Sequence, residues 1–217
     1  MLRLRQGPNI PILQRKKLTL SEYIEVYQQI TSCTACDLSE GRTNAVPGEG
    51  SQVADIMFIG EAPGYYEDRD GRPFIGQAGK LLDEMLAKIN LDRKDVYVTN
   101  MVKCRPPNNR DPLPEEIASC KTYLERQIKM IGPSVIVLLG RHSFARFFPG
   151  ESIGKARGRP RLLNGLKLFP MYHPAAALHN PALRPVISQD FKRLKDLIAD
   201  PGPNPATFVE PEQLSLL

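Results

Sequence analysis

The sequence has few cysteines and no long apolar run. Only four of its 217 residues are Cys. The apolar run from Val135 to Leu139 is far shorter than the roughly 20 residues that cross a bilayer. The first residues alternate Leu with Arg, so the apolar stretch of a secretory signal is also missing. We therefore expect no membrane partner and a cytoplasmic location, where disulfides rarely form.

The charge balance is only mildly basic, and the apolar content is ordinary. Lys and Arg number 29 against 24 Asp and Glu, which gives a net charge of +5, and 41% of the residues are hydrophobic. The chain can therefore bury a core, and its length suits one domain with tails. We find no internal repeat. We expect an irregular basic arm over residues 1–17, one domain over 18–199 and a Pro-rich tail over 200–217.

Buried strands alternate with amphipathic helices along the domain. Short β-branched and aromatic runs bounded by Gly, Pro or Asn predict four strands, at Val53–Ile59, Asp95–Thr99, Ser134–Leu139 and Leu166–Tyr172. Apolar stripes predict five helices, at Leu20–Ile30, Gln77–Ile89, Pro114–Ile131, His142–Phe147 and Val186–Ala199. The fold class is therefore α/β, a mainly parallel sheet covered on both faces.

Polar side chains follow three of the predicted strands. The first strand runs into Gly60 and Glu61, the second into Asn100 and the fourth into His173. Each could be explained singly, as a loop acid, a turn former and a helix cap. Because ligands of such sheets bind outside the carboxyl ends of the strands, we expect the three side chains to form a site.

The four cysteines have the spacing of metal ligands. Cys33 and Cys36 form a Cys-x-x-Cys pair, and fifteen residues separate Cys104 from Cys120. Four thiolates can hold either a tetrahedral zinc ion or an iron–sulfur cluster, and spacing does not separate the two. The alternative is four unrelated buried thiols.

A short stretch alternates cations with Ala, Gly and Pro. It contains Lys155, Arg157, Arg159 and Arg161, and its pattern predicts a loop and not a helix face. Such a loop can lie along a phosphate backbone, or it can be an ordinary solvated surface.

Four motifs together resemble the family 4 uracil-DNA glycosylases. They are Gly60-Glu61-Ala62-Pro63-Gly64, Gly71-Arg72-Pro73-Phe74, Thr99 to Pro107 and His173-Pro174-Ala175-Ala176-Ala177. The resemblance covers about residues 33–197. It implies a three-layer α/β/α sandwich around a central four-stranded parallel sheet, excision of uracil from DNA, and one [4Fe-4S] cluster held by Cys33, Cys36, Cys104 and Cys120.

The same resemblance implies roles for single residues. Phe74 would stack on the flipped uracil, Asn100 would pair with its N3–H and O4, and His173 would donate to O2 as charge develops there. Ala62 stands where the best-known uracil-DNA glycosylases have a water-orienting Asp, so Glu61 becomes the candidate for that task. Glu67 would exclude the methyl group of thymine, against the alternative of a solvated loop acid.

The resemblance also implies contacts with uracil-containing DNA, single- or double-stranded. The segment from His173 to Pro185, with Arg184, is expected to probe the minor groove, and the Lys155–Arg161 stretch is expected to bind phosphates. We expect a monomer. Two other classes remain open: a protein that traps uracil-DNA without turnover, and an iron–sulfur electron carrier. Relatives that trap DNA carry a basic, His-containing insertion near the cluster, and none is visible between Lys103 and Glu115.

The last residues resemble the short peptide with which bacterial repair proteins bind the β sliding clamp. The candidate contacts are Gln213, Leu214, Leu216 and Leu217, with Leu217 where the usual peptide has Phe. A Pro-rich tether would keep the peptide accessible. The alternative is a final element that packs its Leu side chains onto the domain.

Overall fold

The computed structural model describes residues 19–163 and 165–199. The predicted basic arm, and the tail with Gln213, Leu214, Leu216 and Leu217, lie outside these residues. Over the described part of the chain, no helix is both long enough and apolar enough to span a membrane.

The fold is built on one six-stranded sheet. Its strands are β1 (Glu49–Gly50), β2 (Ile56–Gly60), β3 (Tyr97–Asn100), β4 (Val135–Leu139), β5 (Arg161–Leu163) and β6 (Leu166–Met171), in the order β1-β3-β2-β4-β6-β5. The four inner strands are parallel, which confirms the predicted central sheet. The two short outer strands are antiparallel and were not predicted. Val53, placed in the first predicted strand, precedes β2 and is exposed.

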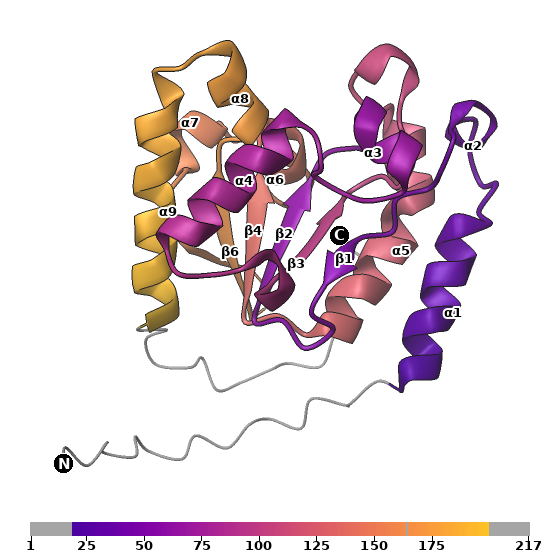
Figure 1. Ribbon diagram of the computed structural model, residues 1–217, viewed down its shortest axis with the longest axis horizontal. Helices are drawn as coiled ribbons and strands as arrows, with labels where there is room; N and C mark the ends of the chain where they lie inside the picture. The colour runs from indigo at the N-terminus through magenta and orange to yellow at the C-terminus, as the bar shows by residue number, and fades with distance from the viewer. Residues whose placement is uncertain (1–18, 164, 200–217) are drawn as a thin grey trace.

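Helices cover both faces of the sheet, so the molecule has three layers (Figure 1). All five predicted helices are present within a few residues, as α1 (Leu20–Thr31), α4 (Gln77–Lys88), α5 (Pro114–Ile131), α6 (Arg141–Phe147) and α9 (Leu183–Ala199). Four short helices were not predicted: α2 (Leu38–Gly41), α3 (Tyr65–Asp70), α7 (Ile153–Ala156) and α8 (Pro174–His179). Two 3₁₀ turns, η1 (Arg93–Asp95) and η2 (Pro107–Asn109), flank β3.

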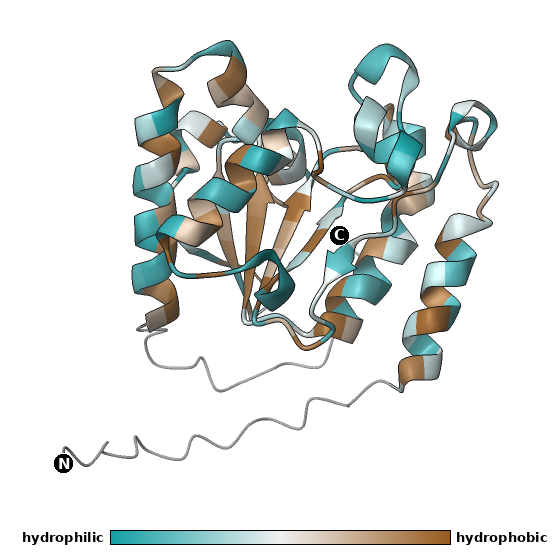
Figure 2. Ribbon diagram, in the orientation of Figure 1, coloured by the Kyte–Doolittle hydropathy of each residue, from teal (hydrophilic) through white to brown (hydrophobic). Residues whose placement is uncertain are grey.

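Alternate residues of each strand enter different layers. Ile56 and Phe58 pack with α4, α8 and α9, whereas Met57 and Ile59 pack with α5, α6 and α7. Each inner strand is therefore buried on both sides, which explains its unbroken apolar run. Figure 2 shows this as brown strands between helices whose outer faces are teal. A third, smaller cluster joins α1 and α2 to Cys104.

Two segments that were interpreted as loops contain helix. The basic stretch begins within α7 and ends in β5, and the segment after His173 forms α8 and the start of α9. Helix α9 begins at Leu183, before the predicted start at Val186. Pro185 can belong to the helix because it lies in the first turn, where the backbone nitrogen has no hydrogen-bond partner within the helix.

Candidate functional site

The carboxyl ends of the inner strands meet at one edge of the sheet. In Figure 1 the strand arrows point to this edge, beside α3, α8 and the start of α4. The register pairs Gly60 at the end of β2 with Asn100 at the end of β3. The structure brings Gly60, Phe74, Asn100 and His173 together there. We call these four residues the base site, after the nucleobase that the family resemblance predicts there.

Asn100 is a buried amide with an unused acceptor. The residue is 2% exposed, and its Oδ1 atom has no hydrogen-bond partner among the described residues. Gly60 leaves room for it, since a Cβ there would lie 2.4 Å from Asn100 Oδ1 and 2.6 Å from Phe74 Cζ. An unpaired buried acceptor is costly, so this atom is suited to a ligand that brings a donor.

Phe74 lies against His173 in an unusual backbone conformation. Its φ of 53° is in the left-handed region, which non-glycine residues rarely adopt. The rings of Phe74 and His173 are 5.4 Å apart between centroids and inclined by 30°. The aromatic face and the imidazole therefore belong to one surface at the strand ends.

Charged groups hold the Phe74 loop from both sides. Arg93 donates through Nη1 to the Phe74 carbonyl oxygen at 3.1 Å and through Nη2 to that of Pro73. The Glu67 Oε1 atom accepts from the amides of Ile75 and Gly76 at 2.9 and 2.8 Å. The Arg93 cation thus donates hydrogen bonds to the loop carbonyls, and the Glu67 anion accepts hydrogen bonds from the loop amides. These contacts fix the strained conformation of Phe74. The structure therefore gives Glu67, predicted to exclude thymine, contacts with the loop main chain.

His173 is held as a neutral imidazole. It caps α8, and its Nδ1 atom accepts from the amide of Ala175 at 3.1 Å. Burial lowers its pKa to about 4, so at neutral pH the single ring proton is on Nε2. Gly140 leaves room for His173, because a Cβ added at Gly140 would lie 3.0 Å from the His173 Cβ. The φ of Gly140, 95°, also favours glycine. The site therefore presents an N–H donor without a positive charge.

Glu61 lies beside a second histidine. Glu61 Oε2 is 3.8 Å from His142 Nε2, and that nitrogen is 3.2 Å from Asp111 Oδ2. Burial raises the pKa of Glu61, with Asp111 acting in the same direction and His142 in the opposite one. Ala62 follows Glu61, half-buried in the turn before α3. The side-chain atoms of Glu61, Asp111 and His142 lie within 4.8 Å of one another.

His142 is a residue that the sequence interpretation missed. It lies two residues beyond Gly140, immediately after the third inner strand, β4. We applied the strand-end rule to the first, second and fourth predicted strands, and the same rule applied to the third would have found it.

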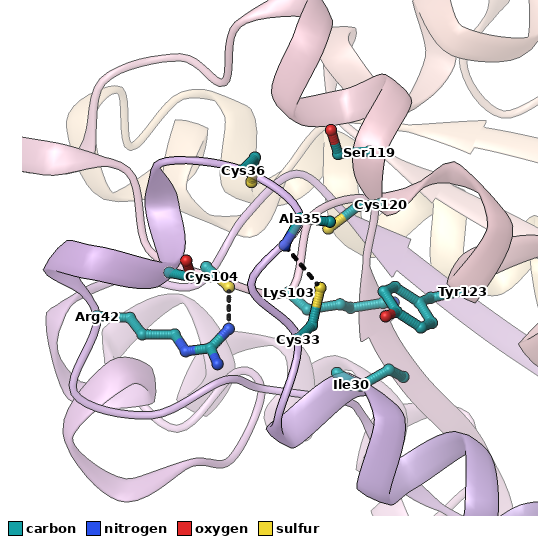
Figure 3. Close-up of a pocket in the computed structure, with 11 residues that line it drawn as sticks. Ile30, Cys33, Ala35, Cys36, Arg42, Lys103, Cys104, Ser119, Cys120 and Tyr123 are labelled. Atoms are coloured by element: carbon teal, nitrogen blue, oxygen red, sulfur yellow. Dashed lines mark hydrogen bonds between the residues drawn. The ribbon is translucent and has the colours of Figure 1, made fainter.

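The four cysteines line one pocket (Figure 3). Cys33 and Cys36 lie between α1 and α2, Cys104 follows β3, and Cys120 is on α5. All four are free thiols. Burial raises the pKa of Cys104, and that of Cys120 to about 11. Arg42 Nη1 is 2.9 Å from Cys104 Sγ. Four sulfur donors beside cationic side chains fit an anionic, thiolate-ligated metal centre.

The predicted DNA-binding cations fall into two groups. Lys155 and Arg159 are exposed. Arg157 pairs with the fully buried Asp190 at 2.7 Å. Arg161 pairs with Glu151 and lies over the Phe148 ring, and Arg184 pairs with Glu84.

Comparison with known proteins agrees with this fold. A family model of the uracil DNA glycosylase superfamily matches residues 47–197, and the chain belongs to that superfamily. A type-4 uracil-DNA glycosylase of Sulfurisphaera tokodaii is 51% identical over 187 residues, which cover 82% of this chain and 85% of the relative. One of Saccharolobus solfataricus is 50% identical, covering 80% and 85%, and one of Thermotoga maritima is 45% identical, covering 85% and 99%. Within the superfamily, the chain is a type-4 uracil-DNA glycosylase.

Proposed function

We propose that this uracil-DNA glycosylase flips deoxyuridine out of DNA into the base site and hydrolyses its N-glycosidic bond. The product would be free uracil and an abasic site, which starts base excision repair. The observation that carries the proposal is the unpartnered Oδ1 of Asn100, buried beside the Phe74 ring, which in turn lies against the His173 ring. It is an acceptor placed for the N3–H group of a stacked uracil.

Base selection follows from the two ends of the Asn100 amide. Oδ1 accepts from uracil N3–H, and Nδ2 donates to O4. Cytosine has no proton on N3 and carries an amino group at position 4, so both hydrogen bonds are lost. Because a buried polar group left unpaired costs more than a weak contact gains, cytosine is rejected. Phe74 supplies the stacking surface.

His173 assists the departure of the base. As the bond between C1′ and N1 breaks, its electron pair passes to uracil, and negative charge grows on O2. The Nε2–H of His173 donates to O2 and is most favourable in the transition state. Since His173 is neutral, it offers this hydrogen bond without transferring its proton.

Glu61 would receive the proton of the attacking water. The water oxygen forms a bond to C1′, and its proton goes to the Glu61 carboxylate, whose pKa is raised by burial. His142 borders Glu61 at 3.8 Å, and its Nε2 atom accepts a hydrogen bond from Arg141 Nε at 2.7 Å. Ala62 has no side-chain group for water and would line the base site with its main chain.

Cys33, Cys36, Cys104 and Cys120 would hold one [4Fe-4S] cluster. Such a cluster supplies four iron–thiolate bonds, which would tie the segment after α1 to the end of β3 and to α5. The donor set fits, because four sulfurs line the same pocket and Arg42 contacts one of them.

DNA phosphates would be bound by Lys155 and Arg159, which are exposed. Arg157, Arg161 and Arg184, each of which forms an ion pair, would add to the same positive surface.

We place the protein in the cytoplasm as a monomer, with a glycosylase domain over residues 18–199. The residues from Gln213 to Leu217 would bind a bacterial β sliding clamp.

A cleavage assay tests the function. A labelled oligonucleotide with one uracil, incubated with the protein and then with alkali, should break at the uracil in single and double strands. The Asn100→Asp variant should lose the preference for uracil over cytosine, because a carboxylate cannot donate to O4. DNA that stays bound and intact would indicate a trapping protein instead.

Deletion of residues 212–217 tests the clamp proposal. The truncated chain should keep full activity on short oligonucleotides and should no longer co-migrate with a bacterial clamp. Unchanged clamp binding by the truncated chain would refute the proposal.

A further inference from the structure

Lys103 is a buried lysine between the cysteine site and the base site. It directly precedes Cys104, is 1% exposed, and lines the pocket of the four cysteines (Figure 3). A lysine without access to water is rare unless its charge is balanced and its protons are bound.

All three ammonium protons of Lys103 have acceptors. Nζ lies 2.6 Å from the carbonyl oxygen of Asn100 and 2.7 Å from both Thr99 Oγ1 and Gln127 Oε1. Thr99 Oγ1 and Gln127 Nε2 each donate in turn to the carbonyl oxygen of Pro47 at 2.7 Å. Lys103 therefore joins the end of β3 to helix α5 and to the segment before β1.

The contact with Asn100 fixes the main chain directly behind the base-reading amide. Past β3, the amides of Met101 and Val102 donate to the carbonyl oxygens of Gly60 and Glu61 at 3.0 and 3.1 Å. The Asn100 carbonyl itself is held by Lys103. The Asn100 side chain has little freedom beside Gly60 and Phe74, so a small rotation of this peptide would turn its amide away from the base.

The groups that could balance the charge of Lys103 lie on the cysteine side. No carboxylate among residues 19–163 and 165–199 is in ion-pair distance of Lys103, and the ionisable groups that interact with it are the Cys104 and Cys120 thiols, which become negative when they bind a metal. We infer that Lys103 is a positioning residue that couples the two sites: its ammonium fixes the Asn100 peptide, and thiolates in a metal-bound cysteine site balance its charge. The inference rests on the roles proposed above for Asn100 and the cysteines.

The test is Lys103→Met, which replaces the aliphatic part of the side chain with an unbranched one of the same length and removes the ammonium. The first measurement is the ratio of affinities for two oligonucleotides that resist cleavage, one with 2′-fluoro-deoxyuridine and one with 2′-fluoro-deoxycytidine. We expect this ratio to fall about tenfold, the equivalent of one hydrogen bond. Affinity for DNA with an abasic-site analogue should not change, because that ligand has no base.

The second measurement is the reduction potential of the iron–sulfur centre. A nearby cation stabilises the more negative, reduced form, so Lys103→Met should move the potential to a more negative value. This readout does not depend on uracil. Failure of the proposed base reading in the wild type and failure of the Lys103 inference are therefore distinguishable.

Lys121→Met is the matched control. Lys121 follows Cys120 on α5, but it is partly exposed and pairs with Glu125 at 3.6 Å. We expect it to leave the affinity ratio unchanged and the potential nearly so. If the Lys103→Met variant does not fold, Gln127→Met is used in its place. Gln127→Met removes one acceptor of the Lys103 ammonium, so it should lower the affinity ratio less than tenfold. A wild-type ratio in the folded variant used, or an equal loss of affinity for all three oligonucleotides, would overturn the inference.

Discussion

At the scale of the residue, the state of His173 decides what the site can do. A histidine whose Nδ1 is occupied by an amide donor and whose charged form is disfavoured by burial can only donate from Nε2. Such a group suits a leaving base that departs as an anion, because it stabilises the charge and does not add a proton in the ground state.

We predict that His173→Ala lowers the single-turnover rate of uracil release by the equivalent of about 2 to 4 kcal/mol, the scale of one lost oxyanion donor. Affinity for uracil-containing DNA should change much less. Rapid-quench kinetics with enzyme in excess measures the rate. A variant with the rate of the wild type would remove His173 from the mechanism.

His173 should also make the fold sensitive to acid. Its pKa falls from 6.5 to about 4 on folding, so below pH 6.5 the unfolded chain takes up the proton first. Its contribution is fully present above 6.5 and is lost as the pH falls toward 4, by up to about 3 kcal/mol. Urea unfolding of wild type and His173→Ala at about pH 7.5 and about pH 4.5 should show this extra loss in the wild type alone.

At the scale of the element, the loop between α3 and α4 depends on Arg93. This side chain is only 18% exposed, and it reaches Glu49 of β1 and Asp83 of α4 as well as the loop carbonyls. Three elements are therefore joined behind Phe74. The left-handed conformation of Phe74 persists because these contacts outweigh its cost of about 1 to 3 kcal/mol.

We predict that Arg93→Met weakens binding of uracil-containing DNA and lowers the free energy of unfolding by about 2 kcal/mol, because buried carbonyl groups lose a charged donor. Affinity for abasic-site DNA should stay unchanged. Arg72→Met is the control, since Arg72 also pairs with Glu49 but is 62% exposed. Equal effects of the two substitutions on uracil binding would contradict this account.

The sequence predicted the long elements well and the short ones poorly. The inner strands and α5 have unbroken apolar runs or stripes, which reflect burial by the final fold. Helices α2, α3 and α7 have four to six residues, too few to show a period. The strand-end rule predicted Glu61, Asn100 and His173 as one site, and the family motifs added Phe74. The contacts of Arg93, Glu67 and Lys103 were not predictable, because each joins segments whose proximity only the tertiary structure creates.

At the scale of the whole molecule, the cysteine site lies where helix α1 and the segment after it meet the rest of the fold. Helix α1 packs on α5 through polar contacts at its surface, such as Tyr123 Oη to the carbonyl oxygen of Gln29 at 3.4 Å, and through the small cluster around Ile30. Metal–thiolate bonds across this boundary would close the long loop from Cys33 to Cys120.

We predict that Cys120→Ser abolishes the brown iron–sulfur absorption and lowers the free energy of unfolding by roughly 4 kcal/mol, the scale expected for closing a loop of this length. Ser119→Ala, one residue away on the same helix, should change neither. Absorption spectroscopy, metal analysis and urea unfolding of anaerobically purified protein measure these effects. A colourless wild type containing one equivalent of zinc would contradict the cluster.

The order of the cysteines along the chain has a consequence for synthesis. Cys33 and Cys36 leave the ribosome early, but the other sulfur ligands of their pocket, Cys104 and Cys120, emerge only after β1, β2 and β3 have been made. Until then α1 has no α5 to pack on, and two neighbouring thiols stay open to oxidation. Delivery of iron to the proposed cluster would therefore wait until residue 120 has emerged, and in a cell short of iron the finished chain would hold α1 by its packing alone.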